Sequence, residues 1–266
     1  MMNKQKLYCL LVALTCATAT WAQTSVSTDE GLRTAIQNNN ANITLTADID
    51  LSNSTLEITN NRTVTINMNN HTLDRKLTGR PSGAGQVFTV REGSTLNLNG
   101  GTVKGGWGGA GGGINNEGTT NLTNVIITGN VADDRGGGVV NKSGCTLTMA
   151  GCTVTGNTSN NHTNNPGGGG IYNAGTLKIQ GKNTVTGNTA GGSTDNLYLA
   201  TGTVITVTGS FKESNTNISN IGITLEGTTG IFTSDYTTYN NWEPYAYFTS
   251  DDDVFYDVTR SLNEGC

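Results

Sequence analysis

The chain of 266 residues carries a net charge of −5, and charged residues make up only 13% of it. Hydrophobic residues make up 34%, and there are 37 glycines but three prolines. Disordered chains combine low hydrophobicity with high net charge and many prolines, so this composition favours an ordered protein of one or two domains. The acidic balance and the lack of a basic cluster exclude a nucleic-acid partner.

The first residues have the features of an export signal. A basic start precedes an apolar run over residues 7–19, and a small-residue cleavage site ends at Ala22. Residues 1–22 are therefore predicted as a signal peptide, with acylation at Cys16 as the weaker alternative. The apolar run is too short to span a membrane and the remaining chain holds none that is long enough, which predicts an exported chain without a transmembrane segment.

Residues 23–42 predict an N-terminal cap built on one short helix, in which Ser27 and Glu30 have the spacing of a capping box. From residue 43 to residue 211, short runs of alternating aliphatic and polar residues predict β-strands. The aliphatic positions are Ile43, Leu45, Ala47, Ile49, Leu51, Val64, Ile66, Leu73, Leu96, Leu98, Val103, Leu147, Met149, Val154, Leu177, Ile179, Val185, Ile205 and Val207.

Three glycine-rich segments repeat one pattern in the middle of the chain. Each opens with glycines and a β-branched aliphatic and closes on Thr-Gly-Asn: GGGINNEGTTNLTNVIITGN from Gly111, GGGVVNKSGCTLTMAGCTVTGN from Gly136 and GGGGIYNAGTLKIQGKNTVTGN from Gly167. No segment between the strands is long enough for a crossover helix, so each strand must pair with its equivalent one coil later, as in a solenoid. Glycine then supplies tight turns and positive φ where coils stack about 4.8 Å apart.

One asparagine follows each glycine triplet at a fixed distance. Asn116, Asn141 and Asn173 each lie three residues after the last glycine, in steps of 25 and 32 residues. Stacked amides can hydrogen-bond from coil to coil, so these three are predicted to form a structural ladder. The difference between the two steps lies mostly in the loop before the triplet, which is residues 131–135 in one coil and 158–167 in the next.

These glycine, aliphatic and asparagine units resemble the repeats of the chlamydial-type polymorphic outer membrane proteins over residues 111–188. Residues 31–52 are similar to the N-terminal cap and first coil of such surface proteins. The resemblance implies an all-β, right-handed parallel β-helix of the pectin-lyase-like superfamily, with about seven coils behind a short N-terminal capping helix. The family's Phe-x-x-Asn motif is absent, and Thr-Gly-Asn takes its place.

Cys145 and Cys152 leave two alternatives open. Seven residues separate them, and an exported chain meets an oxidising compartment, which allows a disulfide between them. Cys145 also shares its strand face with Leu147 and Met149, which favours a buried, small apolar role instead.

Residues 212–266 differ in composition from the repeats and predict a C-terminal capping segment. Nine of the 16 aromatic residues lie from Phe232 onward. An aromatic plug over the open core is one function for them, because a solenoid end must be covered. A glycan-binding patch is the other, because aromatic faces stack on sugar rings. Its candidate ligand-binding residues are Tyr236, Tyr239, Trp242 and Tyr245.

The chain offers few candidates for catalysis or metal binding. A lyase of this superfamily would need a base and Ca²⁺ held by carboxylates, and a hydrolase would need facing carboxylates. Asp133 and Asp134 beside Arg135 are the candidates in the repeat loops, and residues 251–253 form an acidic run. Both groups have the character of solvated surface, so we predict no catalytic residue, no metal and no cofactor.

Paired outward threonines occupy equivalent positions of two coils, at residues 153–155 and 184–186. A flat array of such pairs would suit an ice surface. Ile126 and Lys104 interrupt the same row in the two preceding coils, so ordinary outward strand threonines are the favoured interpretation.

The sequence as a whole predicts a non-enzymatic adhesion or display module at an extracellular or outer-membrane surface. Its expected partners are glycans or the surfaces of host or neighbouring cells. A polysaccharide lyase or hydrolase of the pectin-lyase-like superfamily is the alternative function, since fold alone does not fix activity.

Overall fold

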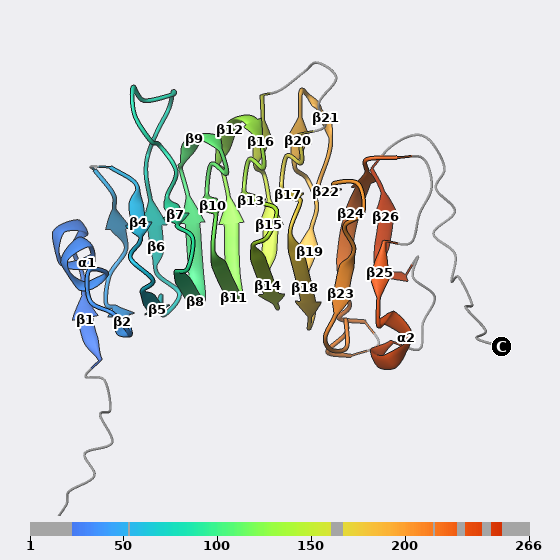
Figure 1. Ribbon diagram of the computed structural model, residues 1–266, viewed down its shortest axis with the longest axis horizontal. Helices are drawn as coiled ribbons and strands as arrows, with labels where there is room; N and C mark the ends of the chain where they lie inside the picture. Colours follow the sequence, from blue (N-terminus) through green and yellow to red (C-terminus); the bar gives the residue numbers. More distant parts are fainter. Residues whose placement is uncertain are drawn as a thin grey trace, which may run out of the picture.

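Consecutive coils of the chain stack along one axis, from the blue N-terminal end to the red C-terminal end (Figure 1). The computed structural model describes residues 23–52, 54–160, 167–214, 216–227, 232–240 and 246–251. Within them the chain is nearly all β and forms a parallel β-solenoid of about seven coils, which confirms the predicted fold class. The predicted signal peptide, residues 1–22, lies outside the described residues.

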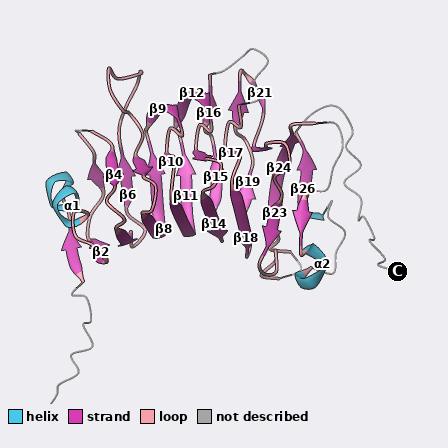
Figure 2. Ribbon diagram, in the orientation of Figure 1, coloured by secondary structure: helices cyan, strands magenta, loops and turns pink. Residues whose placement is uncertain are grey.

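Three series of strands run along the solenoid, and each strand pairs in parallel with its equivalent in the next coil (Figure 2). The first series is β4 (Leu56–Ile58), β7 (Phe88–Val90), β10 (Ile114–Asn116), β13 (Val139–Asn141), β17 (Ile171–Asn173), β22 (Leu197–Leu199) and the second half of β24 (Asn220–Leu225). The second is β1 (Thr24–Val26), β2 (Ala41–Leu45), β5 (Thr63–Asn67), β8 (Thr95–Lys104), β11 (Thr119–Thr128), β14 (Thr146–Ala150), β18 (Thr176–Gln180), β23 (Ile205–Val207) and β25 (Thr233–Ser234). The third is β3 (Ile49–Asp50), β6 (Thr72–Asp74), the second halves of β8 and β11, β15 (Thr153–Thr155), β19 (Thr184–Val185), β24 (Asn220–Leu225) and β26 (Phe248–Ser250).

A smaller sheet of five short strands lies along one edge of the solenoid, at the top of Figure 1. Its strands are β9 (Trp107–Ala110), β12 (Val131–Arg135), β16 (Thr158–Ser159), β20 (Thr189–Ala190) and β21 (Ser193–Thr194). Two of them, β12 and β16, lie between a Thr-Gly-Asn ending and the next glycine triplet, where the coils differ in length. We call this sheet, together with residues 75–87 between β6 and β7, the loop edge.

The interior is filled by the aliphatic residues that the alternation predicts. All of the predicted inward positions are buried in one core except Ala47, which is half-buried. The pairing register stacks them from coil to coil, as Val64 on Leu96 shows. Thr120 takes the next place in that row, where its buried hydroxyl donates to Asn116 Oδ1 at 2.9 Å. The polar exception is therefore hydrogen-bonded, as burial requires.

Helix α1 (Asp29–Ala35) covers the N-terminal end of the core with its buried Leu32. Its N-cap is Thr28, whose side chain accepts from the Gly31 N–H at 3.1 Å, so the predicted cap at Ser27 is wrong by one residue. The Arg33 side chain donates to the main-chain carbonyls that precede β4. A cation on these carbonyls protects an edge that would otherwise be open to strand addition.

The coils extend beyond the predicted limits of residues 43–211. Strand β1 pairs with β2 before the helix, and β24, β25 and β26 continue the parallel pairing as far as Ser250. The predicted capping segment thus contributes strands of its own. The aliphatic alternation is present in β24, at Ile221, Ile223 and Leu225, whereas β25 has only two residues and shows no such pattern.

The glycine triplets stack directly on one another. The first glycine of each triplet has a positive φ, 64° at Gly136, which side chains disfavour. The third lies against the next coil: Gly138 donates to the Gly170 carbonyl at 3.0 Å, and a Cβ at Gly138 would lie 2.6 Å from that oxygen. Backbone therefore packs on backbone without room for a methyl group.

We predict that Gly138→Ala lowers the free energy of unfolding by about 1–3 kcal/mol or more, because the carbonyl of Gly170 belongs to a paired coil and cannot retreat. Chemical denaturation measures the change. The matched control is Gly109→Ala, since a Cβ at Gly109 meets nothing within 4 Å. Equal stability of the two variants would contradict the stacking.

Candidate functional site

The three predicted asparagines lie one above the other inside the solenoid. Asn116 Nδ2 donates to Asn141 Oδ1 at 2.8 Å, and Asn141 Nδ2 donates to Asn173 Oδ1 at 2.7 Å. All three side chains are fully buried, and the backbone pairing places them in register. This ladder lies at the turn between the first strand series and the second.

A second ladder, which the sequence did not indicate, is formed by the asparagines of the Thr-Gly-Asn endings. Successive Nδ2 to Oδ1 distances are 2.9 Å from Asn130 to Asn157, 2.9 Å from Asn157 to Asn188 and 3.0 Å from Asn188 to Asn196. Asn196 then donates to Asp251 Oδ1 at 2.7 Å. The invariant ending of the three repeats was the available signal for this ladder.

Every bond in the second ladder has the same direction. The main-chain N–H of each asparagine also donates to a side-chain oxygen of the next member, at 3.1, 3.0, 2.9 and 2.6 Å along the row. At the last step this oxygen is Asp251 Oδ2, while Asn196 Nδ2 donates to Oδ1. Each of the two oxygens of Asp251 accepts one of these donors, so a carboxylate fits this last position. The prediction that residue 251 belongs to a solvated acidic run is wrong for Asp251, and residues 252–253 lie outside the described residues.

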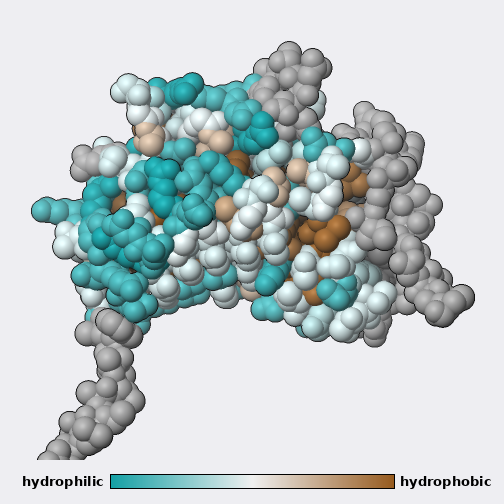
Figure 3. All heavy atoms as spheres, viewed as in Figure 1, coloured by the Kyte–Doolittle hydropathy of each residue, from teal (hydrophilic) through white to brown (hydrophobic). Residues whose placement is uncertain are grey.

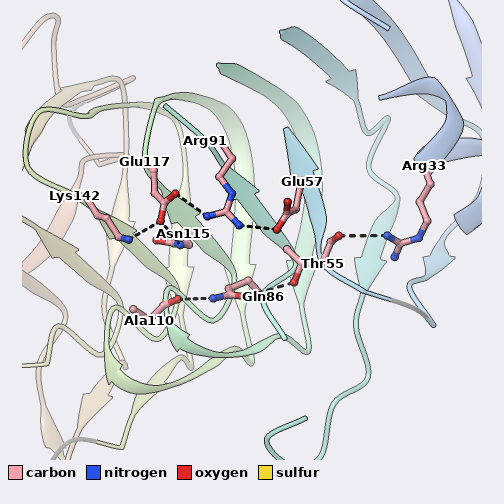
Figure 4. A network of polar contacts seen from close by, with 9 residues as sticks. All are labelled: Arg33, Thr55, Glu57, Gln86, Arg91, Ala110, Asn115, Glu117 and Lys142. Carbon is pink, nitrogen blue, oxygen red and sulfur yellow. Dashed lines mark hydrogen bonds and ion pairs between the residues drawn. The ribbon is translucent and has the colours of Figure 1, made fainter. Parts of the chain in front are cut away.

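Alternating charges form a third ladder on the outer surface (Figure 4). Arg91 bridges two coils, with contacts of 2.8 Å to Glu57 and 3.0 Å to Glu117. Lys142 continues the row with a 2.6 Å contact to Glu117. Each of these residues except Glu57 directly follows a strand of the first series. In Figure 3, hydrophilic residues gather over the N-terminal half and the upper edge of the face shown, and hydrophobic ones toward the C-terminal end.

The environment of Glu117 lowers the pKa of its carboxyl group. Partial burial acts to raise this pKa, but the hydrogen bonds and charges of Lys142 and Arg91 outweigh that effect. The carboxylate is therefore the favoured form in the folded chain. The ladder uses the charge of Glu117 to join two coils.

At the loop edge, the candidate acidic residues Asp133 and Asp134 form hydrogen bonds and ion pairs with neighbouring side chains. Asp133 accepts from Trp107 Nε1 at 2.9 Å and pairs with Arg80 at 3.0 Å. Asp134 pairs with Arg135 at 2.9 Å. The structure thus joins Asp133 and Trp107 from adjacent coils and ties the loop of residues 75–87 to them.

Arg135 also covers an aromatic pair. Its guanidinium carbon lies 4.7 Å from the ring centre of Tyr172, and Nη1 donates to the Tyr172 hydroxyl at 3.0 Å. The Tyr172 ring stacks on Tyr198 of the next coil with ring centres 5.4 Å apart and an interplanar angle of 7°. Tyr198 is buried and Tyr172 is half-buried, so the outer end of this stack is the guanidinium.

The aromatic candidates near the C-terminal end do not form one surface. Tyr236, the first residue of α2 (Tyr236–Tyr239), is buried against Phe211 and Phe248 within the core. Tyr236 is therefore part of a plug, and its predicted ligand contact is wrong. Tyr239 is 46% exposed. Trp242 and Tyr245 lie outside the described residues.

Cys145 and Cys152 are both free thiols, so the disulfide alternative is not what the structure shows. The five residues of β14 separate them by roughly 16 Å, whereas bridged Cα atoms lie within about 7 Å. Cys152 belongs to the core, and burial raises the pKa of its thiol to about 11. Both cysteines have the buried apolar role.

Within the described part of the chain, no three His, Cys, Asp or Glu side chains lie together in a group that could hold a metal ion. The same ranges contain no helix with the length and apolar character needed to cross a membrane.

Comparison with known proteins gives no relative for this chain. No protein-family model, no curated protein and no solved structure matches it. The resemblance to polymorphic outer membrane protein repeats therefore stays a prediction, while the parallel β-solenoid is observed.

We predict that Asn157→Ala lowers the free energy of unfolding by at least about 2 kcal/mol, because it leaves the buried main-chain N–H of Asn130 without its acceptor and removes one of the three hydrogen bonds of Asn130 Nδ2. Urea denaturation measures the change. Asn99→Ala is the control: it removes one amide bond, to Asn67, from a half-buried outer position, and we expect a loss below about 1 kcal/mol. Comparable losses would show that the buried ladder has no special weight.

We also predict a pH dependence from Glu117. A lowered pKa in the folded chain means that its stabilisation is complete above the ordinary value of 4.5 and is lost as the pH falls through the lowered value. The difference in unfolding free energy between the wild type and Glu117→Gln should be about 0.5–1 kcal/mol near neutral pH and vanish in strong acid. A difference that grows on acidification would contradict the assignment. Lys142→Met should remove part of the same difference.

Proposed function

We propose that this chain is an exported adhesion or display module that presents its loop edge to glycans or to neighbouring cell surfaces, without catalysing a reaction. The proposal rests on the part of the repeat in which the coils differ in length. The step between equivalent coils changes from 25 to 32 residues, yet Asn116, Asn141 and Asn173 stay in register. Most of the additional residues lie in the sequence between Asn157 and Gly168, next to β16 of the loop edge. The ladder thus stays constant while a segment that adjoins this edge varies in length, as in binding scaffolds.

The side chains at the loop edge suit recognition of a polar ligand. Trp107, Tyr172 and Arg135 bring aromatic and cationic groups to one edge, and these residue types dominate binding hot spots. The ion pairs of Arg80 and Arg135 hold the rim in place before a ligand arrives. The proposal places the main contact at this edge, while Tyr239 near the C-terminal end is a second exposed aromatic group.

A polysaccharide lyase or hydrolase is the second candidate, since Asp133 and Asp134 lie at the same edge. Their contacts favour a structural role. Asp133 is engaged by Trp107 and Arg80, and Asp134 by Arg135, so each carboxylate already has a cationic partner at 3.0 Å or less.

The experiment is a glycan array probed with the chain from residue 23 onward, followed by calorimetry on the strongest ligand. We expect Arg135→Ala to weaken binding at least about tenfold, because it removes a charged group from the rim. Tyr239→Ala is the matched control and should bind as the wild type does. Thermal unfolding checks that both variants are folded.

The outcomes separate the candidates. If Tyr239→Ala weakens binding and Arg135→Ala does not, the contact lies at the C-terminal end. If no glycan binds, glycan recognition fails. Release of unsaturated or reducing ends from pectate or alginate with Ca²⁺, abolished by Asp134→Ala, would favour the enzyme instead.

A further inference from the structure

Four consecutive strands of the second series carry no charge on their outer face, and Lys178 on β18 is the first charged residue beyond them. Strands β5, β8, β11 and β14 present three outward positions each, and all twelve are threonine, asparagine or alanine. They are Thr63, Thr65, Asn67, Thr95, Asn97, Asn99, Thr119, Asn121, Thr123, Thr146, Thr148 and Ala150. We call these twelve residues the neutral face.

The neutral face is ordered in two directions. Its first row is threonine in five consecutive coils, because the backbone register continues into β18. The members are Thr63, Thr95, Thr119, Thr146 and Thr176. Parallel pairing sets about 4.8 Å between coils, and the strand sets about 6.6 Å between outward positions. The side chains therefore form a grid that is periodic in two directions, with a spacing that the backbone defines.

Hydrogen bonds hold the side chains of this grid in place. Asn121 Nδ2 donates to Asn97 Oδ1 at 2.8 Å, and Asn97 Nδ2 donates to Thr65 Oγ1 at 3.1 Å. Asn99 Nδ2 donates to Asn67 Oδ1 at 3.0 Å. Threonine is already stiff at χ1 because it is β-branched. A face with so little side-chain freedom loses little entropy when it meets a rigid partner.

Charge is present on both sides of the neutral face. The third strand series carries an ion pair between Lys104 and Asp74 at 3.3 Å and a second between Lys76 and Asp50. The first series carries the ladder centred on Glu117. Neutrality is thus a local property of the twelve positions.

We propose that the neutral face binds ice. An ice surface is uncharged, rigid and periodic in two directions, and it presents both donors and acceptors. Threonine offers one donor, two acceptors and a methyl group, so a grid of threonines meets such a surface without a buried charge. A flexible glycan does not require a fixed grid of side chains for binding. The face also lacks the aromatic groups that supply affinity for such ligands.

The register also explains why the threonine pairs of the third series carry no such proposal. Thr153 lies beside Ile126, and Lys104 beside Thr128, as the sequence predicts. The row that continues through five coils begins instead at Thr63. It was missed because its threonines lie 24 to 32 residues apart in the sequence, and only the register aligns them.

The experiment measures partition into a slowly grown ice hemisphere, together with thermal hysteresis in a nanolitre osmometer. The wild type should enter the ice and shape growing crystals. Thr119→Tyr places a ring in the middle of the row of five threonines, and we expect its partition to fall about tenfold because contact along this row is lost. Thr153→Tyr, on β15 of the third series and equally half-buried, is the matched control and should partition as the wild type does.

The proposal is independent of glycan binding at the loop edge. Exclusion of the wild type from ice, without hysteresis, overturns it. Equal partition of the two folded variants overturns it as well. If the wild type instead sediments with microcrystalline cellulose and Thr119→Tyr does not, the face recognises a solid polysaccharide and the assignment to ice is wrong.

Discussion

The structure depends on the way in which buried turns of stacked coils satisfy their polar groups. Coils about 4.8 Å apart leave no space for water between them, so each main-chain N–H at an inner turn needs a protein acceptor. The asparagine side chain meets this need because it accepts from the coil before it and donates to the coil after it. Such a row has a direction, and the donors of its last asparagine need an acceptor that is not another asparagine of the row. Asp251 supplies this acceptor.

This internal arrangement leaves the outer surface free to differ from face to face. Glycine triplets and amide ladders hold the coils together from within, so the outward side chains contribute less to the fold. One face carries alternating charges centred on Glu117, another is neutral, and the loop edge gathers aromatic and cationic groups around Arg135. A single scaffold thereby offers surfaces of distinct chemistry, which is the physical basis of both proposals.

Local patterns in the sequence predicted the features that repeat at short range. Alternation identified the inward aliphatic residues, and the spacing after each glycine triplet placed Asn141 between Asn116 and Asn173. Features that join distant residues could not be predicted in this way. The partner of Asn196 is Asp251, 55 residues away, and the neutral face exists only once the coils are aligned. The burial of Tyr236 could not be predicted either, because an aromatic residue near an open end can plug the core or face the solvent.

Native-state hydrogen exchange of the ladder amides tests the central claim most directly. The main-chain N–H groups of Asn130, Asn157 and Asn188 donate to buried side-chain oxygens, so they should exchange only through global unfolding, with the slowest amides of the protein. Exchange of these three at the rate of an exposed turn, such as that around Gly202, would show that the directed ladder does not hold the coils together.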